Sequence, residues 1–302
     1  MRVSLVEAVE ILRDGGVVAV PTETVYGIAA KADSEEALAT LIALKGRSST
    51  NPMSILIANM ADLRQYTNTF PNKFEELISF WPGPLTLAIP LKKTVVSPYI
   101  RAGKENVSFR MPGSLILQQI ICDCGPIVCP SANRSGRTPA LSIEDVQNEF
   151  GDRLAVLADE EEGTGIESTV LSFQKERWIL IREGVIPVEK IEPMVGYPLQ
   201  QEAVEEGVIS PMCQLSTGKY DPLYPLVLGF EGRDYPGAKK VVVMGPVDQP
   251  KIVAKKLFQS LRTVENEDAE RIWVDMDFPQ QGLFRSIRHR IKQWAESWRP
   301  AL

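Results

Sequence analysis

The chain has 302 residues, of which 44% are hydrophobic and 24% are charged, and its formal net charge at pH 7 is −6. This composition is typical of a water-soluble globular protein with enough core for two domains, and the acidic balance argues against a chain held to nucleic acid by its overall charge. The apolar runs are too short to span a bilayer, and the first 16 residues lack a signal-peptide pattern, which predicts a cytoplasmic protein.

The chain opens with a helical apolar pattern over 4–14 and a short apolar run over 17–20, which predicts a buried strand. Polar residues follow this strand at once in the segment PTETVYG, whose last residue, Gly27, is expected to free the backbone to turn. Ligands of open α/β sheets lie at the carboxyl ends of strands, so Thr24 and its neighbours form a first candidate site. The residues alone leave an ordinary strand-end turn equally open.

A helix is predicted from the cap residue Ser34 to Gly46, and it places Lys45 and Arg47 at its C-terminal end. The helix dipole alone favours cations there, by about 0.3 to 1 kcal/mol. The next four residues, SSTN, form a donor-rich loop of the kind that can wrap a phosphate chain. Two interpretations of Lys45 and Arg47 therefore stay open: cations that only stabilise the helix end, and part of a phosphate site.

Strands are predicted over 53–58, 85–90 and 107–111, with a helix over 72–81 between the first two. The third of these strands carries Arg110 within an otherwise apolar segment. A buried charge is rarely unpaired, so we expect Arg110 to have either a structural ion-pair partner or an anionic ligand. The residues alone do not distinguish the two.

Two more strand ends carry polar groups. The strand predicted over 126–129 runs into PSANRSG, which contains Ser131 and Asn133, and the strand over 178–181 delivers Arg182. Hydroxyl, amide and guanidinium groups that converge from several strand ends are what an anionic small-molecule site requires. The other predicted elements of this half are helices over 115–121 and from 142 to about 150, and a strand over 168–173.

The segment 197–222 is rich in Pro, Gly, Ser and Glu and has no sustained period, so we expect an interdomain linker between domains over 1–196 and 223–302. The second domain alternates predicted strands and helices, which favours a small Rossmann-like α/β unit. It has no glycine-rich nucleotide fingerprint, so no cofactor of its own is expected. Its strands are predicted over 223–228, 240–244 and 271–274, and its helices over 252–261 and 284–298. The last helix is locally basic, which is typical of a solvated helix face and, as an alternative, of an RNA contact.

The cysteines and the histidine limit the chemistry. Cys122, Cys124, Cys129 and Cys213 have no zinc spacing, which predicts reduced thiols. The single histidine, His289, argues against a Ser-His-Asp or Cys-His site. Catalysis must therefore rest on Arg, Lys, hydroxyl and amide groups, and on any metal that a substrate brings.

In this order, the chain contains the segments GVVAVPTETVYG, ALKGRSSTNPM, FWPGPLTLAIP, VSFRMP, PSANRSG, GIESTV and ILIREGV. This ordered set resembles the YrdC-like family of threonylcarbamoyl-AMP synthases. AKKLFQSLR at 254–262 and QGLFRSIRHRIKQWA at 281–295 are similar to helices in the extra domain of the family's longer form. The resemblance implies a YrdC-like, twisted open mixed sheet with helices, followed by a small Rossmann-like α/β C-terminal domain.

The resemblance also implies an enzyme that makes threonylcarbamoyl-adenylate and pyrophosphate from L-threonine, bicarbonate or carbon dioxide, and ATP with Mg²⁺. The ion would be carried by ATP, without metal ligands from the chain. The product would pass to a separate transferase complex that modifies the adenosine beside the anticodon of certain tRNAs. Such a reaction needs mainly positioning and charge stabilisation, which agrees with the near absence of histidine.

Carried over position by position, the family's motifs imply the site residues. Lys45 and Arg47 match its Lys-x-Arg motif and are expected to be catalytic. The expected L-threonine contacts are Thr24, Arg110 and Ser168, with Arg110 holding the carboxylate. The expected ATP contacts are Arg47, Asn51, Ser131, Asn133, Thr138, Arg182 and Tyr220.

The chain departs from the family's pattern at two places. Leu56 stands where the longer form often has a histidine, which predicts that one threonine contact is missing or replaced. Lys219 stands for a linker histidine beside Tyr220, in a segment that in the family folds back over the nucleotide.

Two other functions stay open. One is a YrdC-like RNA-binding module without synthase activity, against which the acidic first domain argues. The other is an enzyme for a different carbamoyl-adenylate, as in hydrogenase maturation proteins. Those proteins carry zinc-finger-like and acylphosphatase-like modules, for which this sequence has no counterpart.

Overall fold

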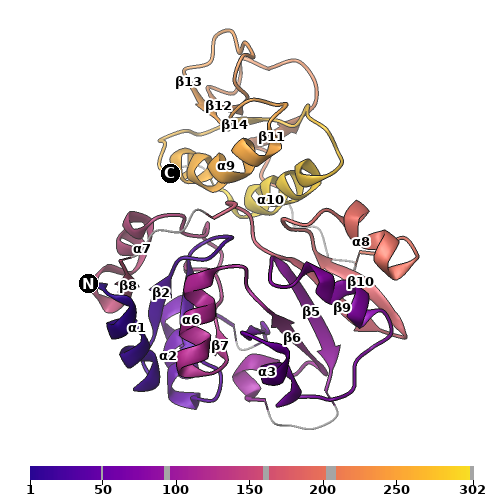
Figure 1. The fold of residues 1–302 in the computed structure, drawn as a ribbon. Coiled ribbons are helices and arrows are strands. Elements are labelled where there is room, and N and C mark those ends of the chain that lie inside the picture. The colour runs from indigo at the N-terminus through magenta and orange to yellow at the C-terminus, as the bar shows by residue number, and fades with distance from the viewer. Residues whose placement is uncertain (49, 92–95, 159–162, 202–208, 300–302) are drawn as a thin grey trace. The chain divides into compact units, whose positions relative to one another are not determined.

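The structure is a computed structural model (Figure 1), which describes residues 1–48, 50–91, 96–158, 163–201 and 209–299. The chain divides into two compact units, one formed by residues 1–163 and 167–202 and the other by residues 164–166 and 203–302. Residues 202–208 of the predicted linker lie outside the described residues.

The first unit is built on a ten-stranded mixed sheet with the order β1-β8-β2-β3-β7-β4-β6-β5-β9-β10. Four neighbouring pairs are parallel, namely β1 with β8, β8 with β2, β4 with β6, and β5 with β9, and the other pairs are antiparallel. This confirms the predicted open mixed sheet. The strands are β1 (Arg2–Val3), β2 (Val18–Val20), β3 (Gly27–Lys31), β4 (Ser54–Leu56), β5 (Leu85–Pro90), β6 (Asn106–Arg110), β7 (Ile127–Val128), β8 (Ala155–Leu157), β9 (Thr169–Gln174) and β10 (Arg177–Arg182).

Helices cover both faces of this sheet, because its strands alternate buried side chains between two apolar clusters. In β2, Val18 and Val20 belong to the cluster formed with α1 and α6, whereas Ala19 belongs to the cluster on the other face. Figure 1 shows α1 and α6 side by side. The helices are α1 (Leu5–Arg13), α2 (Glu35–Lys45), α3 (Met60–Arg64), α4 (Phe74–Leu77), α5 (Pro98–Arg101), α6 (Leu115–Cys124), α7 (Ile143–Phe150) and α8 (Val188–Val195), with 3-10 turns at Ile78–Phe80 and Gly151–Arg153.

Helix α2 forms as its sequence predicts. The Ser34 side chain accepts a hydrogen bond from the Ala37 backbone N–H at 3.2 Å, and Gly46 ends the helix in the left-handed conformation, at φ 58°. The last residue of the helix is therefore Lys45, which is buried.

Gly27 has a different role from the predicted one. The residue begins strand β3 instead of making a turn, and it pairs with Val20. A Cβ atom on Gly27 would lie 2.3 Å from Cys129 Sγ and 3.3 Å from the carbonyl oxygen of Pro130. Glycine is needed here because the Cys129 side chain and the backbone of residues 129 and 130 pack against it, not because the chain reverses.

The second unit contains a four-stranded, fully parallel sheet with the order β11-β14-β12-β13, which confirms the Rossmann-like prediction. Strand β11 falls within the segment predicted to be a linker, so that part of the prediction is wrong. Buried side chains recur at helical spacing on α9 and α10, which pack together. The elements are β11 (Cys213–Ser216), β12 (Leu226–Gly229), β13 (Lys240–Val243), α9 (Pro250–Glu265), β14 (Ile272–Asp275) and α10 (Leu283–Ser297).

The sequence favours a solvated face for the basic residues of α10, but two of these residues are not simply solvated. Arg288 donates hydrogen bonds to the carbonyl oxygens of Met276 and Phe278, both at 2.8 Å, and its guanidinium lies 4.4 Å from the centre of the Phe278 ring. Arg290 is buried and donates to Gln293. Arg288 therefore fastens the helix to the segment that follows β14, whereas the bond of Arg290 to Gln293 lies within the helix.

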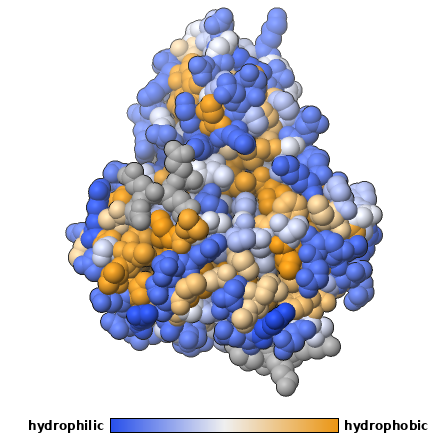
Figure 2. Space-filling view, in the orientation of Figure 1, coloured by the Kyte–Doolittle hydropathy of each residue, from blue (hydrophilic) through white to orange (hydrophobic). Residues whose placement is uncertain are grey.

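On the face drawn in Figure 2, hydrophilic residues surround several groups of apolar ones. The most exposed large ones include Val6, Leu115 and Leu223. Apolar atoms contribute more than half of the accessible surface of an ordinary globular protein. None of the helices in the described parts of the chain is long and apolar enough to cross a membrane.

Candidate active site

Two polar loops that are far apart in sequence meet because β3 and β7 pair antiparallel. Hydrogen bonds continue this pairing beyond β7, from the Ile28 backbone N–H to the Pro130 carbonyl oxygen at 2.8 Å and from the Ala132 N–H to the Tyr26 carbonyl oxygen at 2.7 Å. The β2–β3 loop and the loop after β7 therefore lie side by side. Both line one cavity.

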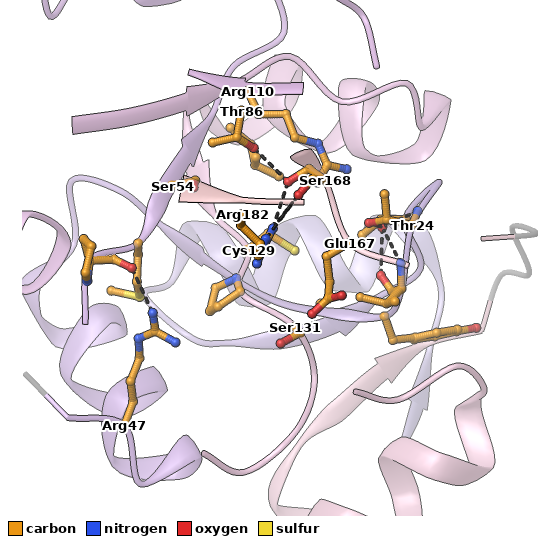
Figure 3. Close-up of a pocket in the computed structure, with 18 residues that line it drawn as sticks. Thr24, Arg47, Ser54, Thr86, Arg110, Cys129, Ser131, Glu167, Ser168 and Arg182 are labelled. Atoms are coloured by element: carbon orange, nitrogen blue, oxygen red, sulfur yellow. Dashed lines mark hydrogen bonds between the residues drawn. The ribbon is translucent and has the colours of Figure 1, made fainter. Parts of the chain in front are cut away.

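This cavity collects six of the eleven predicted site residues, at the ends of several strands. Figure 3 shows Arg47 at one side and Thr24 at the other, with Ser131, Ser168 and Arg182 between them. The cavity is lined by Thr22, Thr24, Val25, Tyr26, Gly27, Arg47, Pro52, Met53, Ser54, Leu56, Thr86, Arg110, Cys129, Pro130, Ser131, Glu167, Ser168 and Arg182. The predicted residues that do not line it are Lys45, Asn51, Asn133, Thr138 and Tyr220.

Arg182 and Ser168 form one hydrogen-bonded group. The Arg182 guanidinium donates from Nε and Nη2 to the carbonyl oxygen of Ser168, at 3.1 and 2.9 Å, and from Nη2 to Ser168 Oγ at 3.0 Å. Ser168 Oγ also lies 2.8 Å from the hydroxyl of Thr86. Arg182, at the end of β10, thereby sets the position of Ser168, which precedes β9.

Arg110 is the C-terminal residue of β6 and is buried. Its Nη2 atom donates to Glu23 Oε1 at 2.6 Å, so the guanidinium has the ion-pair partner that the sequence left open. Arg110 also lines the cavity. The two expectations for this residue, an ion pair and a place at the ligand site, are therefore compatible.

Arg47 follows α2 and is held by the loop after it. Its Nε and Nη2 atoms donate to the carbonyl oxygens of Asn51 and Pro52, at 3.3 and 2.8 Å. Asn51 contributes this carbonyl but does not line the cavity. The donor-rich loop after the helix therefore orients the cation, in addition to any contact that it makes with a ligand.

Lys45 binds the loop after β7. Its Nζ atom donates to the carbonyl oxygens of Ser131 and Asn133, and its own carbonyl oxygen accepts from the Ser135 backbone N–H at 2.8 Å. Burial, and secondly the charge of Arg47, lower the pKa of Lys45 to about 7. The side chain thus supports the loop that carries Ser131 into the cavity.

Asn133 braces the same loop from within. Its side-chain amide donates to the carbonyl oxygens of Arg134 and Arg137, at 3.0 and 2.6 Å, and its Oδ1 atom accepts from Ser131 Oγ at 2.6 Å. Thr138 is buried near the end of this loop. The Ser-x-Asn motif therefore combines a cavity residue with a residue that shapes the loop.

Tyr220 lies in the second unit, at the end of the predicted linker. Its hydroxyl donates to the Tyr224 carbonyl oxygen at 2.6 Å, and its ring packs edge-on against Tyr235 and Trp273. Its contact with the nucleotide stays a prediction. Leu56, by contrast, is buried and lines the cavity, at the place where the family's histidine is expected.

The sequence analysis missed Ser54, Thr86, Cys129 and Glu167 as residues that line the cavity. Thr86 could have been found by the argument used for Arg110, because it is a polar residue in an otherwise apolar strand and is 1% exposed. Cys129 is half-buried, and desolvation of its thiol raises the pKa to about 12. It is therefore a neutral thiol at physiological pH and not a nucleophile.

Gly184 packs directly against the backbone that precedes β9. A Cβ atom there would lie 2.3 Å from the Glu167 carbonyl oxygen and 2.4 Å from the Thr169 backbone nitrogen. Because neither atom can move independently, we expect Gly184→Ala to destabilise the protein by about 1 to 3 kcal/mol and to displace Ser168. Thermal unfolding measures the first effect and ligand binding the second. Gly218→Ala is the control, since its Cβ would meet only Ser216 Oγ at 3.5 Å, and an unchanged melting temperature in Gly184→Ala would contradict the prediction.

Two family matches together cover most of the chain. Residues 10–184 match the Sua5–YciO–YrdC family, described as "Telomere recombination". Residues 200–295 match the family described as "Threonylcarbamoyl-AMP synthase, C-terminal domain".

Relatives match along nearly the full length. A Bacillus subtilis protein named threonylcarbamoyl-AMP synthase is 33% identical and matches over 96% of this chain and 92% of its own length. A Pyrococcus abyssi protein of the same name is also 33% identical, over 92% of this chain and 82% of its own. The crystal structure of P. abyssi Sua5 complexed with L-threonine superposes with a TM-score of 0.85 and 27% identity, over 100% of this chain and 98% of that one. The chain therefore belongs to the Sua5–YciO–YrdC family, in the two-domain form that carries the C-terminal domain of threonylcarbamoyl-AMP synthases.

Proposed function

We propose that this protein is a nucleotidyltransferase that makes L-threonylcarbamoyl-adenylate and pyrophosphate from L-threonine, bicarbonate or carbon dioxide, and ATP. One observation carries the proposal: all three residues expected to bind the amino acid and three of the seven expected to bind ATP line a single cavity. The names of the full-length relatives support the same reaction. Thr24, Arg110 and Ser168 form the proposed threonine set, and Arg47, Ser131 and Arg182 form the proposed ATP set.

The chemistry suits a cavity of this composition. The amine of threonine adds to carbon dioxide and loses a proton to give a carbamate. A carbamate oxygen then attacks the α-phosphorus of ATP, and pyrophosphate leaves with the electron pair of the broken P–O bond. Catalysis of such a displacement is mainly alignment of the two reactants and stabilisation of charge on the phosphate oxygens.

Each group has a task that its geometry allows. Arg110 would hold the threonine carboxylate, since a guanidinium keeps donors beyond the one that it gives to Glu23. Arg47 and Arg182 would bind phosphate oxygens, and Ser131 Oγ, which already donates to Asn133, would accept or relay a hydrogen bond. Lys45 would act through the loop that it holds.

Mg²⁺ would enter with ATP as part of the substrate and neutralise charge on its phosphates. In the described residues, no group of three or more His, Cys, Asp or Glu side chains could hold a metal ion. The cations and hydroxyls of the cavity would bind the nucleotide, and its phosphates would hold the ion.

The product would be consumed by a transferase complex that modifies tRNA. An adenylate of a carbamate is a mixed anhydride, so the partner must transfer its activated acyl group to a nucleophile, which on adenosine would be the amine. The alternative function is a YrdC-like module that binds RNA or nucleotide without synthase activity. It would give a salt-dependent RNA affinity without ATP turnover.

Pyrophosphate release from ATP with Mg²⁺ tests the proposal. We expect release that requires both L-threonine and bicarbonate, with kcat/KM at least about tenfold lower for L-serine, because the loss of a methyl group from a pocket costs about 1 to 3 kcal/mol. Release without either co-substrate would indicate a simple ATPase. No release together with RNA binding would favour the alternative function.

A further inference from the structure

The carboxylate of Glu23 connects two walls of the cavity, although its side chain does not line that cavity. Its Oε1 atom accepts a hydrogen bond from Arg110 Nη2 at 2.6 Å and another from the Gly113 backbone N–H at 3.0 Å. Glu23 belongs to the β2–β3 loop, which also brings Thr24 to the cavity. Arg110 and Gly113 belong to the end of β6 and the turn that follows it. One oxygen atom therefore joins the segments that carry two of the expected threonine contacts.

This contact fixes the Arg110 side chain. The two side chains are 9% and 16% exposed, so water competes little for the pair. Among the described residues, the bond to Glu23 is the only hydrogen bond of this guanidinium, and Arg110 Nε and Glu23 Oε2 are buried without a partner. A long side chain with a single anchor keeps its orientation only as long as that anchor remains, since its free rotamers are entropically favoured.

We propose that Glu23 is a positioning residue for the amino-acid substrate. It holds Arg110 with the remaining guanidinium donors toward the cavity, and it fixes the distance between Arg110 and Thr24. The inference rests on the proposed function, because it takes Arg110 as the group that binds the threonine carboxylate. Glu23 also compensates the charge of Arg110 when the cavity is empty, so that the guanidinium can stay buried without a bound anion.

Glu23 positions Arg110 mainly through the geometry of its hydrogen bonds and less through its charge. A glutamine at position 23 presents an oxygen at the same distance from the backbone and can accept from both Arg110 and Gly113. An alanine accepts from neither. An aspartate keeps the charge, but its carboxylate is one methylene too short to reach both donors.

The test compares Glu23→Ala, Glu23→Gln and Glu23→Asp in the full-length protein. Calorimetry measures the Kd for L-threonine, and pyrophosphate release measures the KM for ATP at saturating threonine. We expect the threonine Kd to rise at least tenfold in Glu23→Ala and at least threefold in Glu23→Asp, and to stay within threefold of the wild type in Glu23→Gln. The KM for ATP should change less than twofold throughout.

Glu7→Ala is the matched control. The Glu7 carboxylate also accepts a backbone N–H, that of Ser4 at 2.7 Å, but it caps α1 and does not line the cavity. Its loss should lower the melting temperature and leave threonine binding unchanged. The comparison separates damage to the fold from a change at the site.

The outcomes are distinguishable. Threonine binding within twofold of the wild type in Glu23→Ala would overturn the inference, as would an equal loss for threonine and ATP. A loss in Glu23→Gln as large as in Glu23→Ala would contradict the hydrogen-bonding role. If Glu23→Ala does not fold, the threefold rise in Glu23→Asp is the deciding measurement. Wild-type protein that binds no L-threonine would contradict the proposed function itself.

Discussion

Replacing Arg182 with alanine should reduce threonine-dependent pyrophosphate release by a factor of about 10² to 10³, because a preorganised charge in a site that excludes water is worth about 3 to 4 kcal/mol. The substitution has a second effect on the same cavity. It removes the donors that hold the Ser168 carbonyl oxygen and Oγ. We therefore expect loss of turnover and weaker threonine binding, which steady-state kinetics and calorimetry measure separately.

The controls follow from strand β10. Arg177→Ala changes an arginine of the same strand that lies over the Tyr197 ring, at 4.4 Å, and does not line the cavity, so activity should be kept. Arg182→Lys keeps the charge but cannot donate from two atoms to Ser168, so its activity should be intermediate. Arg47→Ala should lose turnover as Arg182→Ala does. Near wild-type turnover in either alanine variant would refute the assignment of these phosphate contacts.

Most strands of the sheet can be predicted from local sequence. The strands that cannot be predicted in this way share one cause. Strand β5, LTLAIP, is a largely apolar run, and β6, NVSFR, alternates apolar with polar residues, so both are visible in the sequence. Strand β3, GIAAK, has weak intrinsic strand preference and forms because it pairs with β2 and β7. Strand β11, CQLS, lies in a polar segment and is a strand only because β14 pairs with it. These two segments are strands because they pair with residues distant in the sequence. A local sequence pattern carries no information about such pairing.

Some residues of the cavity could be predicted from the sequence, but their hydrogen-bond partners could not. Three strand ends that carry polar groups predicted one anionic site, and Thr24, Ser131 and Arg182 from these ends line one cavity. The partners of these groups were not predictable, because they come from distant parts of the chain. Glu23 is 87 residues from Arg110, and Ser131 is 86 residues from Lys45. The burial expected for Arg110 predicted that it has a partner. Which residue is the partner depends on strand order and register, which the sequence alone does not give.

The lowered pKa of Lys45 gives a stability profile that can be measured. The folded-state pKa is about 7, and the ordinary value is 10.5. Between these values the unfolded chain binds one proton more than the folded protein does, so the free energy of unfolding rises with pH by about 1.4 kcal/mol per pH unit. Below pH 7 the lysine is protonated in both states and this contribution is flat.

Lys45→Met isolates this contribution. Methionine keeps an unbranched apolar stem but cannot donate to the Ser131 and Asn133 carbonyl oxygens, and each buried acceptor that loses its donor costs about 1 to 3 kcal/mol. Urea unfolding at pH 6.5, 7.5 and 8.5 should show a wild-type stability that rises relative to Lys45→Met across this range. The variant should also lose turnover, because the loop that carries Ser131 is no longer held.

Lys73→Met controls for the loss of a positive charge, since Lys73 is a surface residue that pairs with Glu76 at 2.8 Å. The raised thiol pKa of Cys213 is shared by all three proteins and cancels in the comparison. Desolvation raises the pKa of Cys129 and the charge of Lys45 lowers it, so loss of Lys45 raises that pKa further, and the Cys129 thiol stays neutral across this pH range in every variant. Parallel stability curves for the wild type and Lys45→Met would mean that the lysine is protonated throughout this range. Its two hydrogen bonds would then outweigh its burial, and Lys45 would be a permanent cation beneath the loop that carries Ser131 instead of a group that titrates near neutral pH.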